Sequence, residues 1–354
     1  MRTYTFHEVI DQLDSAKPFA ETNFCLTALP KLQTLLPVLR GRLRQKLGVP
    51  LVLLQHLLLV LSLIGKGRNY DLVLVRDFLS LPLICFVWMV LPLRNKICFI
   101  NVQNLQRAHM RRSHRLVFSL LCRMKFRFAC LEGDEGLQEL GISMTPEQFF
   151  CLPHIVVPAR GGEGITPGQR KRVGIVGTYR PEKGIGGLIK HLMDIQAKAD
   201  VDVMIGTPDS AVLKEYLKTF DNDIEVRDTS NGADYAAALQ SCDVVLFNYN
   251  REDYYYRGSG VITNAVECGA SVVCPDYPVF RRQVLSPVPV GYLFEDESKI
   301  VETALSALQD RELLHANIEA YSSFRNPRAV AKIIDAFAGK QQSPSQRNGH
   351  ASSR

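Results

Sequence analysis

The stretch VGIVGTYRPEKGIGG, residues 173–187, decides the fold class of this chain. Its first four residues, VGIV, are typical of a buried strand, which runs into a turn at Gly177 and then into a glycine-rich helix start. Such a unit directs free backbone N–H groups and the positive end of a helix dipole at one point, which suits an anion. Arg180 and Lys183 lie in the same turn. Two such cations suit a diphosphate better than a single carboxylate.

Short apolar runs alternate with helical patterns from there to residue 308. The expected strands are Val173–Val176, Val201–Ile205, Ile224–Val226, Val244–Phe247, Ser271–Cys274 and Val290–Phe294. The expected helices are Gly186–Lys198, Ser210–Phe220, Gly232–Ser241, Gly260–Cys268 and Glu297–Leu308. This order predicts a doubly wound α/β domain with a parallel sheet, in which ligands bind at the carboxyl ends of the strands. Gly177, Asn248 and Pro275 each follow a strand, so we expect them to share one edge of the sheet.

The first part of the chain carries a weaker form of the same alternation. We expect strands at Tyr70–Val75, Ile97–Val102 and Ala129–Leu131, helices after Ser80 and over Leu105–Lys125 and Pro146–Phe150, and a closing segment at Pro153–Val157. The segment PARGGEGITPGQRKR, residues 158–172, is typical of an interdomain linker, and residues 339–354 are typical of a disordered tail. The sequence therefore predicts two domains, residues 1–157 and 173–338.

Length and composition fit this organisation. A chain of 354 residues with 46% hydrophobic and 22% charged residues can form two folded cores. The nine cysteines include no CxxC pair and are typical of reduced thiols in a cytosolic protein. Residues 1–160 carry 20 Lys and Arg against 11 Asp and Glu, a net charge of +9, whereas the remainder has a net charge of −3. We therefore expect the first half to face something anionic.

Two apolar runs, Val49–Ile64 and Phe78–Leu93, need comparison with membrane spans. The first contains Gln55 and His56, and the second is 16 residues long and holds two prolines. Both fall short of the roughly 20 residues that a spanning helix needs, so we expect buried core helices instead. The first residues lack the apolar core of a secretory signal, which favours a cytoplasmic protein.

A second informative stretch is YYYRGSGVITNAVECGASVVCPD, residues 254–276. Ser259 and Gly260 precede an apolar run and are typical of a loop that enters a helix, which Gly269 then ends. Backbone N–H groups at Ser259, Gly260 and Val261 would form a second site for an anion or a hydroxyl group. An ordinary tight turn without a ligand is the alternative.

Taken in order, these stretches resemble the C-terminal donor domain of GT-B glycosyltransferases of group 1 (family 4). The family's Gly-Arg-x-x-Pro-Glu-Lys-Gly corresponds to GTYRPEKG at residues 177–184, and its Asp-containing strand corresponds to SCDVVLFNYN at residues 241–250. Its E-A-x-x-x-G helix corresponds to NAVECG at residues 264–269, and its later turn to GYLF at residues 291–294. The resemblance covers about residues 171–310 and implies two Rossmann-like domains that face each other.

The resemblance implies a metal-independent, retaining transfer of a sugar from a nucleotide-diphosphate donor to a glycan or lipid-linked acceptor, with no cofactor. Lys183 and Arg180 would stabilise the charge that builds on the β-phosphate, which is often the largest catalytic contribution. The other donor-binding residues that it implies are Gly177, Thr178, Gly184, Tyr256, Arg257, Ser259, Gly260, Val261 and Asn264.

Three of these positions depart from the family's pattern. Thr178 stands where the family has its arginine, and Tyr256 and Asn264 stand where it has a pair of glutamates. Because neither of the last two is a carboxylate, a catalytically degenerate nucleotide-binding or scaffold protein of the same fold is the alternative.

The first half of the chain matches the family poorly. Asn104 and His109 follow an expected strand, and this order is similar to the family's acceptor-side segment. An ordinary exposed histidine is the alternative for His109, which we expect to lie in a helix with three arginines close behind it. Arg94–Arg127 holds nine Lys and Arg and no acidic residue. Its apolar residues at helical spacing are Leu116, Val117, Leu120, Leu121 and Met124. A basic amphipathic helix suits an anionic surface, here the inner face of a membrane or a lipid phosphate, and a core helix with solvated cations is the alternative.

Other interpretations fit the residues less well. Nucleic acid is not expected as a partner, because no recognition-helix pattern or aromatic platform accompanies the positive charge. A nicotinamide-dependent oxidoreductase would need G-x-G-x-x-G and an acidic residue about 20 positions further on, and the sequence has neither. The D-x-D at residues 221–223 indicates a plain polar turn. No His or Cys set has zinc-ligand spacing, so no metal is expected.

Overall fold

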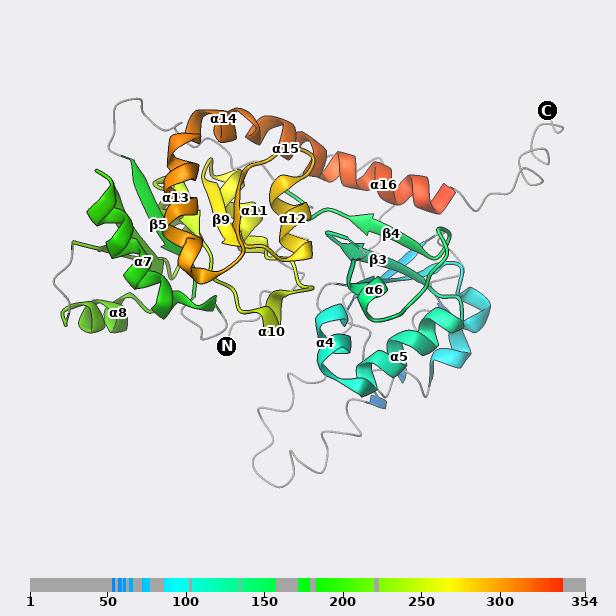
Figure 1. Cartoon of the computed structure of the whole chain (residues 1–354). Helices are drawn as coiled ribbons and strands as arrows, with labels where there is room; N and C mark the ends of the chain where they lie inside the picture. Colours follow the sequence, from blue (N-terminus) through cyan, green and yellow to red (C-terminus); the bar gives the residue numbers. More distant parts are fainter. Residues whose placement is uncertain are drawn as a thin grey trace, which may run out of the picture. The chain divides into compact units, whose positions relative to one another are not determined.

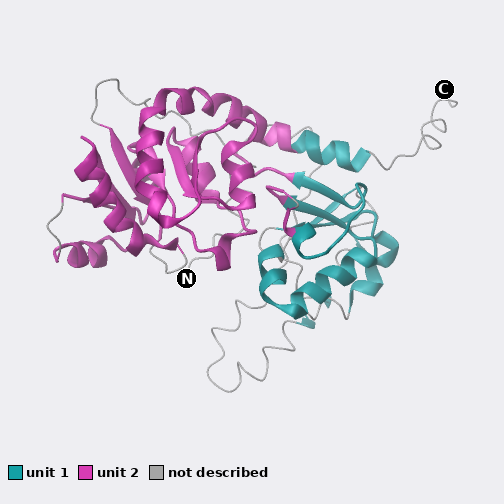
Figure 2. Cartoon of the chain, in the orientation of Figure 1, with its two compact units in different colours: residues 1–130, 137–151, 331–354 teal, residues 131–136, 152–330 magenta. Residues whose placement is uncertain are grey.

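The computed structural model describes residues 72–76, 86–101, 104–133, 135–156, 171–178, 183–219 and 223–339, with a few short pieces between residues 53 and 65. Figure 1 shows its helices and strands, and Figure 2 shows that they fall into two compact units. Unit 1 contains residues 1–130, 137–151 and 331–354. Unit 2 contains residues 131–136 and 152–330.

Unit 1 is built on a sheet with the strand order β1-β2-β3-β4. The strands are β1 (Val73–Arg76), β2 (Ile97–Asn101), β3 (Arg127–Leu131) and β4 (Phe149–Leu152). The helices are η3 (Trp88–Leu93), α4 (Asn104–Met110), α5 (Arg112–Arg123) and α6 (Glu135–Glu139), of which the first two residues belong to unit 2. The Phe128 ring stacks on Phe118 at a centroid distance of 4.9 Å, and both rings are fully buried. Aromatic packing of this kind forms the core beneath α5.

Two predictions for unit 1 are wrong in detail. The helix expected over residues 105–125 is two helices, because Arg111 adopts an extended backbone (φ −128°, ψ 118°) between α4 and α5. The apolar periodicity continues across this break and does not reveal it. The segment expected as a helix at residues 146–150 leads into β4, where burial alternates from residue to residue. That period of two is the pattern of a strand.

Unit 2 is built on a six-stranded sheet with the order β10-β9-β8-β5-β6-β7, and every neighbouring pair is parallel. The strands are β5 (Arg172–Val176), β6 (Asp202–Thr207), β7 (Glu225–Asp228), β8 (Val244–Leu246), β9 (Ser271–Pro275) and β10 (Gly291–Phe294). The first helices are α7 (Ile185–Lys198), α8 (Ser210–Leu217), α9 (Gly232–Gln240), α10 (Arg251–Tyr254), α11 (Gly260–Glu267) and α12 (Pro278–Leu285). The last are η5 (Glu297–Lys299), α13 (Ile300–Gln309), α14 (Arg311–Ala316) and α15 (Ile318–Arg325). Helix α16 (Pro327–Gly339) begins in unit 2 and continues in unit 1.

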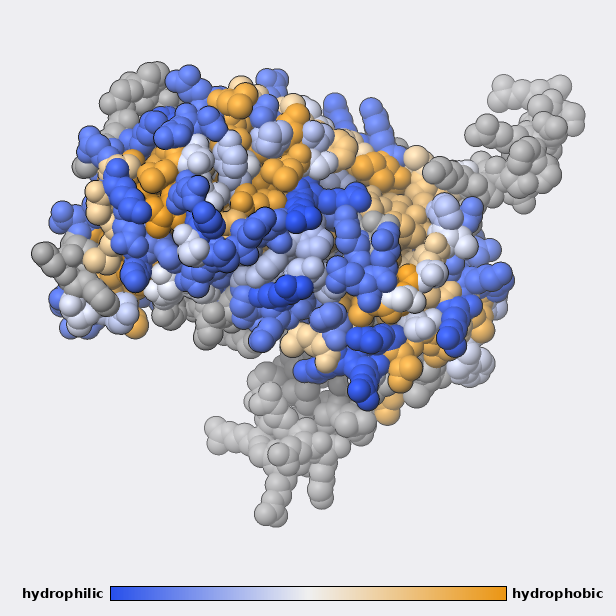
Figure 3. All heavy atoms as spheres, in the orientation of Figure 1, coloured by the Kyte–Doolittle hydropathy of each residue, from blue (hydrophilic) through white to orange (hydrophobic). Residues whose placement is uncertain are grey.

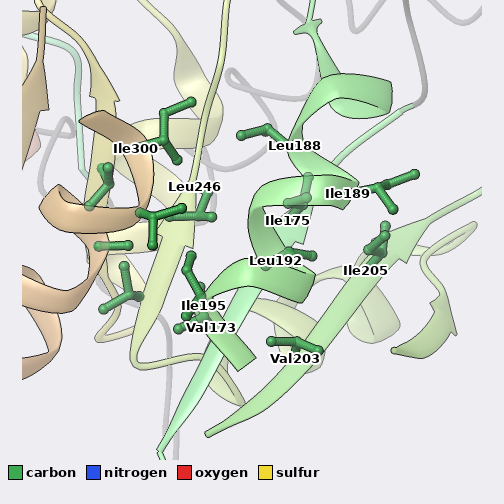
Figure 4. Close-up of a cluster of buried hydrophobic side chains, with 14 of the residues drawn as sticks. Val173, Ile175, Leu188, Ile189, Leu192, Ile195, Val203, Ile205, Leu246 and Ile300 are labelled. Atoms are coloured by element: carbon green, nitrogen blue, oxygen red, sulfur yellow. The ribbon is translucent and has the colours of Figure 1, made fainter. Parts of the chain in front are cut away.

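Helices cover both faces of this sheet, as a doubly wound fold requires. On one face, Leu188 and Leu192 of α7 lie in one buried cluster with Val173 and Ile175 of β5 (Figure 4). On the other face, Ile262 of α11 belongs to a second buried cluster. The α/β fold that the alternation of strands and helices predicts is therefore confirmed, with each strand of unit 2 found within two residues of its expected bounds.

The division into units differs from the predicted domains at three places. Residues 131–136 and 152–156 belong to unit 2, although they precede the expected linker. Arg172, the last residue of that linker, begins β5, and residues 158–170 lie outside the described part of the chain. Residues 331–339 belong to unit 1, because the ring of Phe337 packs on Phe150 at 4.0 Å.

The two apolar runs compared with membrane spans, residues 49–64 and 78–93, lie in large part outside the described residues. Within the described residues, no helix combines the length and the apolar character needed to cross a membrane. The cysteines in the same residues are all free thiols.

Candidate functional site

The strand order of unit 2 reverses between β5 and β8. From β5 the sheet extends through β6 and β7 in one direction, and β8, β9 and β10 are added on its other side. Val173 and Gly174 of β5 lie beside Val244 and Val245 of β8, so the carboxyl ends of these two strands are neighbours. In open parallel sheets, ligands bind outside the carboxyl ends at such a switch point.

Lys183 reaches the end of β5. Gly177 follows the strand at φ +146°, and its N–H donates to the Gly206 carbonyl oxygen at 2.9 Å. A Cβ atom at Gly177 would lie 3.2 Å from the Lys183 Nζ. The ammonium group therefore lies over the turn that the sequence predicts as an anion site. Thr178, the next residue, is half-buried, and Arg180 lies outside the described residues.

The start of α7 meets the end of β8. Gly184 precedes the helix with a left-handed backbone (φ 60°), and a Cβ atom there would lie 2.4 Å from the Asn248 carbonyl oxygen. Both the left-handed backbone and the close approach of the Asn248 carbonyl oxygen require glycine at this position. The first turn of α7, Lys183 and Asn248 thus lie at one edge of the sheet, as expected from the residues that follow each strand. Free N–H groups at a helix start together with an ammonium group favour a phosphate oxygen.

Glu297 is a residue of this edge that sequence reasoning missed. A Cβ atom at Gly187, in the first turn of α7, would lie 2.8 Å from the Glu297 Oε1. The same oxygen lies 3.3 Å from the His191 Nε2. Nothing in the sequence links residues that are 106 positions apart. The carboxylate lies beside the positive end of the α7 dipole, where negative charge is stabilised.

Ser259 does not offer its N–H to a ligand, contrary to the prediction. Its N–H donates to the Gln283 Oε1 at 3.1 Å, and its hydroxyl pairs with the Tyr249 hydroxyl at 2.9 Å. The side chain is buried because the turn packs against α12. Gly260, the first residue of α11, is exposed and has open space where a Cβ would be. A role of the Gly260 and Val261 N–H groups toward a ligand stays a prediction.

Three more predicted donor-site residues have contacts within unit 2. The Tyr256 ring is buried, and a Cβ atom at Gly136 would lie 2.6 Å from it. The Arg257 guanidinium lies 4.8 Å from the centroid of the Tyr254 ring. The Asn264 Nδ2 lies 3.5 Å from the Tyr235 hydroxyl of α9. Roles of these residues toward a donor stay predictions.

The predicted acceptor-side residues lie in unit 1. Asn104 begins α4, and His109 is exposed near the end of the same helix. Within the described residues, no group of His, Cys, Asp and Glu side chains could hold a metal ion. Of the D-x-D at residues 221–223, only Asp223 is among the described residues, and it is exposed.

Unit 2 is thus a doubly wound α/β domain whose parallel sheet has its switch point between β5 and β8. Residues 163–323 match the family described as glycosyl transferases group 1. This match agrees with the expected resemblance to GT-B glycosyltransferases of group 1, which is confirmed. No curated protein matches the chain in sequence.

Solved structures with a similar fold include GT-B glycosyltransferases. Sucrose-phosphate synthase from Thermosynechococcus elongatus is 14% identical with a TM-score of 0.59, and the match covers 90% of this chain and 82% of that one. A UDP-forming trehalose-phosphate synthase from Burkholderia xenovorans is 14% identical with a TM-score of 0.55, over 93% and 85% of the two chains. A chain of the GtfA/B complex is 11% identical with a TM-score of 0.57, over 81% of this chain. This chain spans only 60% of that relative's length.

Proposed function

We propose that this protein transfers a sugar from a nucleoside-diphosphate donor, which unit 2 binds at the carboxyl edge of its sheet. The observation that carries the proposal is the Lys183 ammonium group over the turn at Gly177, beside the start of α7. The family of this domain supports it. So does the pneumococcal O-GlcNAc transferase GtfA, which has the same fold and was solved in complex with UDP and GlcNAc.

The chemistry follows from the leaving group. Negative charge builds on the β-phosphate as its bond to the sugar breaks, and Lys183, Arg180 and the first N–H groups of α7 would stabilise that charge. Preorganised donors of this kind contribute roughly 2.7–4 kcal/mol each to transition-state stabilisation. The N–H groups of Gly260 and Val261 would bind further donor oxygens. By resemblance to the family, the transfer is metal-independent and retains the configuration of the sugar.

Unit 1 is the proposed acceptor side, with a glycan or a lipid-linked acceptor. Helix α5 and the residues before it expose cations together with apolar side chains. Leu116 is 71% exposed, and Arg111, Arg112 and Arg115 are also exposed. In Figure 3, hydrophilic and hydrophobic residues lie side by side where Figure 1 draws α4 and α5. An anionic lipid surface suits both kinds of side chain.

A screen of thermal stability against UDP, GDP, ADP and their sugars tests donor binding. A ligand of the native state raises the melting temperature by mass action. In the enzyme assay with the donor so found, Lys183→Ala should lower turnover by about 100-fold or more. Lys190→Ala is the matched control, because Lys190 is an exposed cation on α7. Equal turnover in the two variants would contradict the role of Lys183.

A catalytically degenerate protein of the same fold is the second candidate. Tyr256 and Asn264 favour it, since neither supplies the negative charge of the family's glutamates. Such a protein would bind a nucleotide, or none, and would show neither sugar transfer nor slow hydrolysis of the donor. Calorimetry followed by a donor-hydrolysis assay separates the two candidates.

A further inference from the structure

A buried glutamine holds the turn that opens α11. The Gln283 side chain is 0% exposed. Its Oε1 accepts the Ser259 N–H at 3.1 Å, and its Nε2 donates to the Ser259 carbonyl oxygen at 2.6 Å. One side chain thus satisfies both backbone groups of the residue directly before the helix. Gly260, whose N–H begins the proposed donor contact, follows without an intervening residue.

Gln283 is itself held in place by α15. The Tyr321 hydroxyl donates to the Gln283 carbonyl oxygen at 2.7 Å. The Arg325 Nη2 donates to the carbonyl oxygens of Arg282 and Ser286 at 2.9 and 3.0 Å. These bonds fix the backbone of α12 on both sides of Gln283, so its amide has little freedom to move away from Ser259.

The same arginine extends the polar network to the other side of the turn. Arg325 donates through Nη1 to the Glu132 carboxylate, which also accepts the His154 N–H at 2.6 Å and pairs with its ring Nδ1 at 2.9 Å. A Cβ atom at Gly258 would lie 2.2 Å from the His154 Cε1. The imidazole ring therefore packs directly on the residue before Ser259. Gly258 is held by this ring and Ser259 by Gln283.

A buried polar network of this kind is costly. Desolvation of polar groups opposes folding, and apolar residues of similar size often stabilise a core equally well. What the polar groups supply is direction, because hydrogen bonds fix the orientation of the backbone that they contact. The backbone that these hydrogen bonds orient here is the start of α11, whose first N–H groups are the proposed donor contacts.

We propose that Gln283 is a positioning residue for the donor site. It acts through Ser259 to orient the N–H groups of Gly260 and Val261, with the His154 ring holding the turn from the other side. The proposal rests on the proposed function of unit 2, and it assigns Gln283 to ligand binding without contact to the ligand.

The test compares two glutamines in the full-length protein. Gln283→Met keeps the length of the side chain and removes both hydrogen bonds to Ser259. Gln148→Met is the matched control, because Gln148 holds backbone carbonyls of Cys122 and Phe126 in unit 1 at 3.0 and 3.3 Å. Affinity for UDP, GDP and ADP is measured by calorimetry well below the melting temperature of each variant. We expect Gln283→Met to raise the dissociation constant of the nucleotide about tenfold, and Gln148→Met to change this constant less than twofold.

Hydrogen exchange without any nucleotide provides the second measurement. Gln283→Met should speed exchange of the amides of Ser259 and of the first turn of α11, and Gln148→Met should leave them unchanged. Unchanged exchange at these amides, or equal losses of affinity in both variants, overturns the proposal. If the wild-type protein binds none of the three nucleotides, the proposed function fails, and the exchange result still decides whether Gln283 orders the turn.

Discussion

At the scale of single residues, the Glu132 carboxylate belongs to a buried cluster of ionisable side chains that could not be predicted from the sequence. Glu132 is 3% exposed and has a left-handed backbone (φ 63°), and its two partners are 22 and 193 positions away. Burial alone would raise the pKa of Glu132, but Arg325 and His154 hold it at about 2. The position of Lys183 beside Gly177 could be predicted, because both residues lie in the same short turn. The contacts of Glu132, Gln283 and Glu297 could not be predicted, because their partners are distant in the sequence and meet only in the folded chain.

The depressed pKa of Glu132 predicts an acid-dependent loss of stability. Its folded value of about 2 lies below the ordinary 4.5, so the charged form stabilises unit 2 fully above pH 4.5. This contribution is lost as the pH falls from 4.5 toward 2, since the unfolded chain then binds the proton more tightly. Glu132→Gln should lower the free energy of unfolding by about 3 kcal/mol at pH 7, because it leaves Arg325 buried without its partner charge.

Urea unfolding at pH 3, 5 and 7 checks this prediction. The stability of Glu132→Gln should vary less with pH than that of the wild type. Glu215→Gln is the control, because its exposed ion pair with Lys218 contributes at most about 0.5 kcal/mol. Parallel pH profiles for the wild type and Glu132→Gln would contradict the assignment.

At the scale of elements, the spacing of apolar residues predicts the strands of unit 2 well, but it does not predict the break between α4 and α5. Residues 173–176, 244–247 and 271–274 were predictable as strands because short apolar runs end at glycine or polar turns. The break at Arg111 carries no proline or glycine, so nothing local distinguishes it from helix. Its consequence is that α5 begins as a separate amphipathic helix, with Val117, Phe118, Leu121 and Cys122 on its buried face.

The exposed face of α5 predicts salt-dependent binding to anionic vesicles. Arg112 and Arg123 are exposed at its two ends, and a cation near such a surface contributes about 1 kcal/mol. Replacing both by glutamine should therefore weaken binding to phosphatidylserine vesicles about tenfold or more at low salt. Leu116→Ser should weaken it as well, because this apolar side chain would enter the interface.

Pelleting with anionic and with neutral vesicles measures the effect. Val212→Ser is the matched control: Val212 lies on α8 of unit 2 and is 74% exposed, close to the 71% of Leu116. Equal binding to both kinds of vesicle would argue against electrostatic docking, and an unchanged Leu116→Ser variant would argue against insertion of α5.

At the scale of the whole molecule, the chain passes between its units more often than a single linker allows. Residues 131–136 leave unit 1 and the chain returns at residue 137, and residues 331–339 of α16 join unit 1 after all of unit 2 has been built. A change in composition along the sequence can indicate one linker, as the glycine-rich and proline-containing residues 158–172 do. It cannot show that residues 331–339, which follow unit 2, pack against unit 1.

The return of α16 predicts that a substitution near residue 337 destabilises unit 1. Phe337 is 5% exposed and packs on Phe150, and Arg127 lies 3.7 Å over its ring and donates to its carbonyl oxygen at 2.7 Å. Phe337→Ala removes this packing and should lower the free energy of unfolding of unit 1 by about 3 kcal/mol.

Hydrogen exchange of the β2 and β3 amides follows unit 1, and exchange of the β5 and β8 amides follows unit 2. Phe337→Ala should lower the urea concentration at which β2 and β3 lose protection and should leave the protection of β5 and β8 unchanged, because unit 2 keeps its own core. Phe324→Ala, which replaces a phenylalanine of α15 that is 42% exposed, should leave the midpoint of unit 1 unchanged. Loss of protection in all of these strands at one lowered midpoint in Phe337→Ala would mean instead that the two units unfold as one, with α16 as the element that couples them.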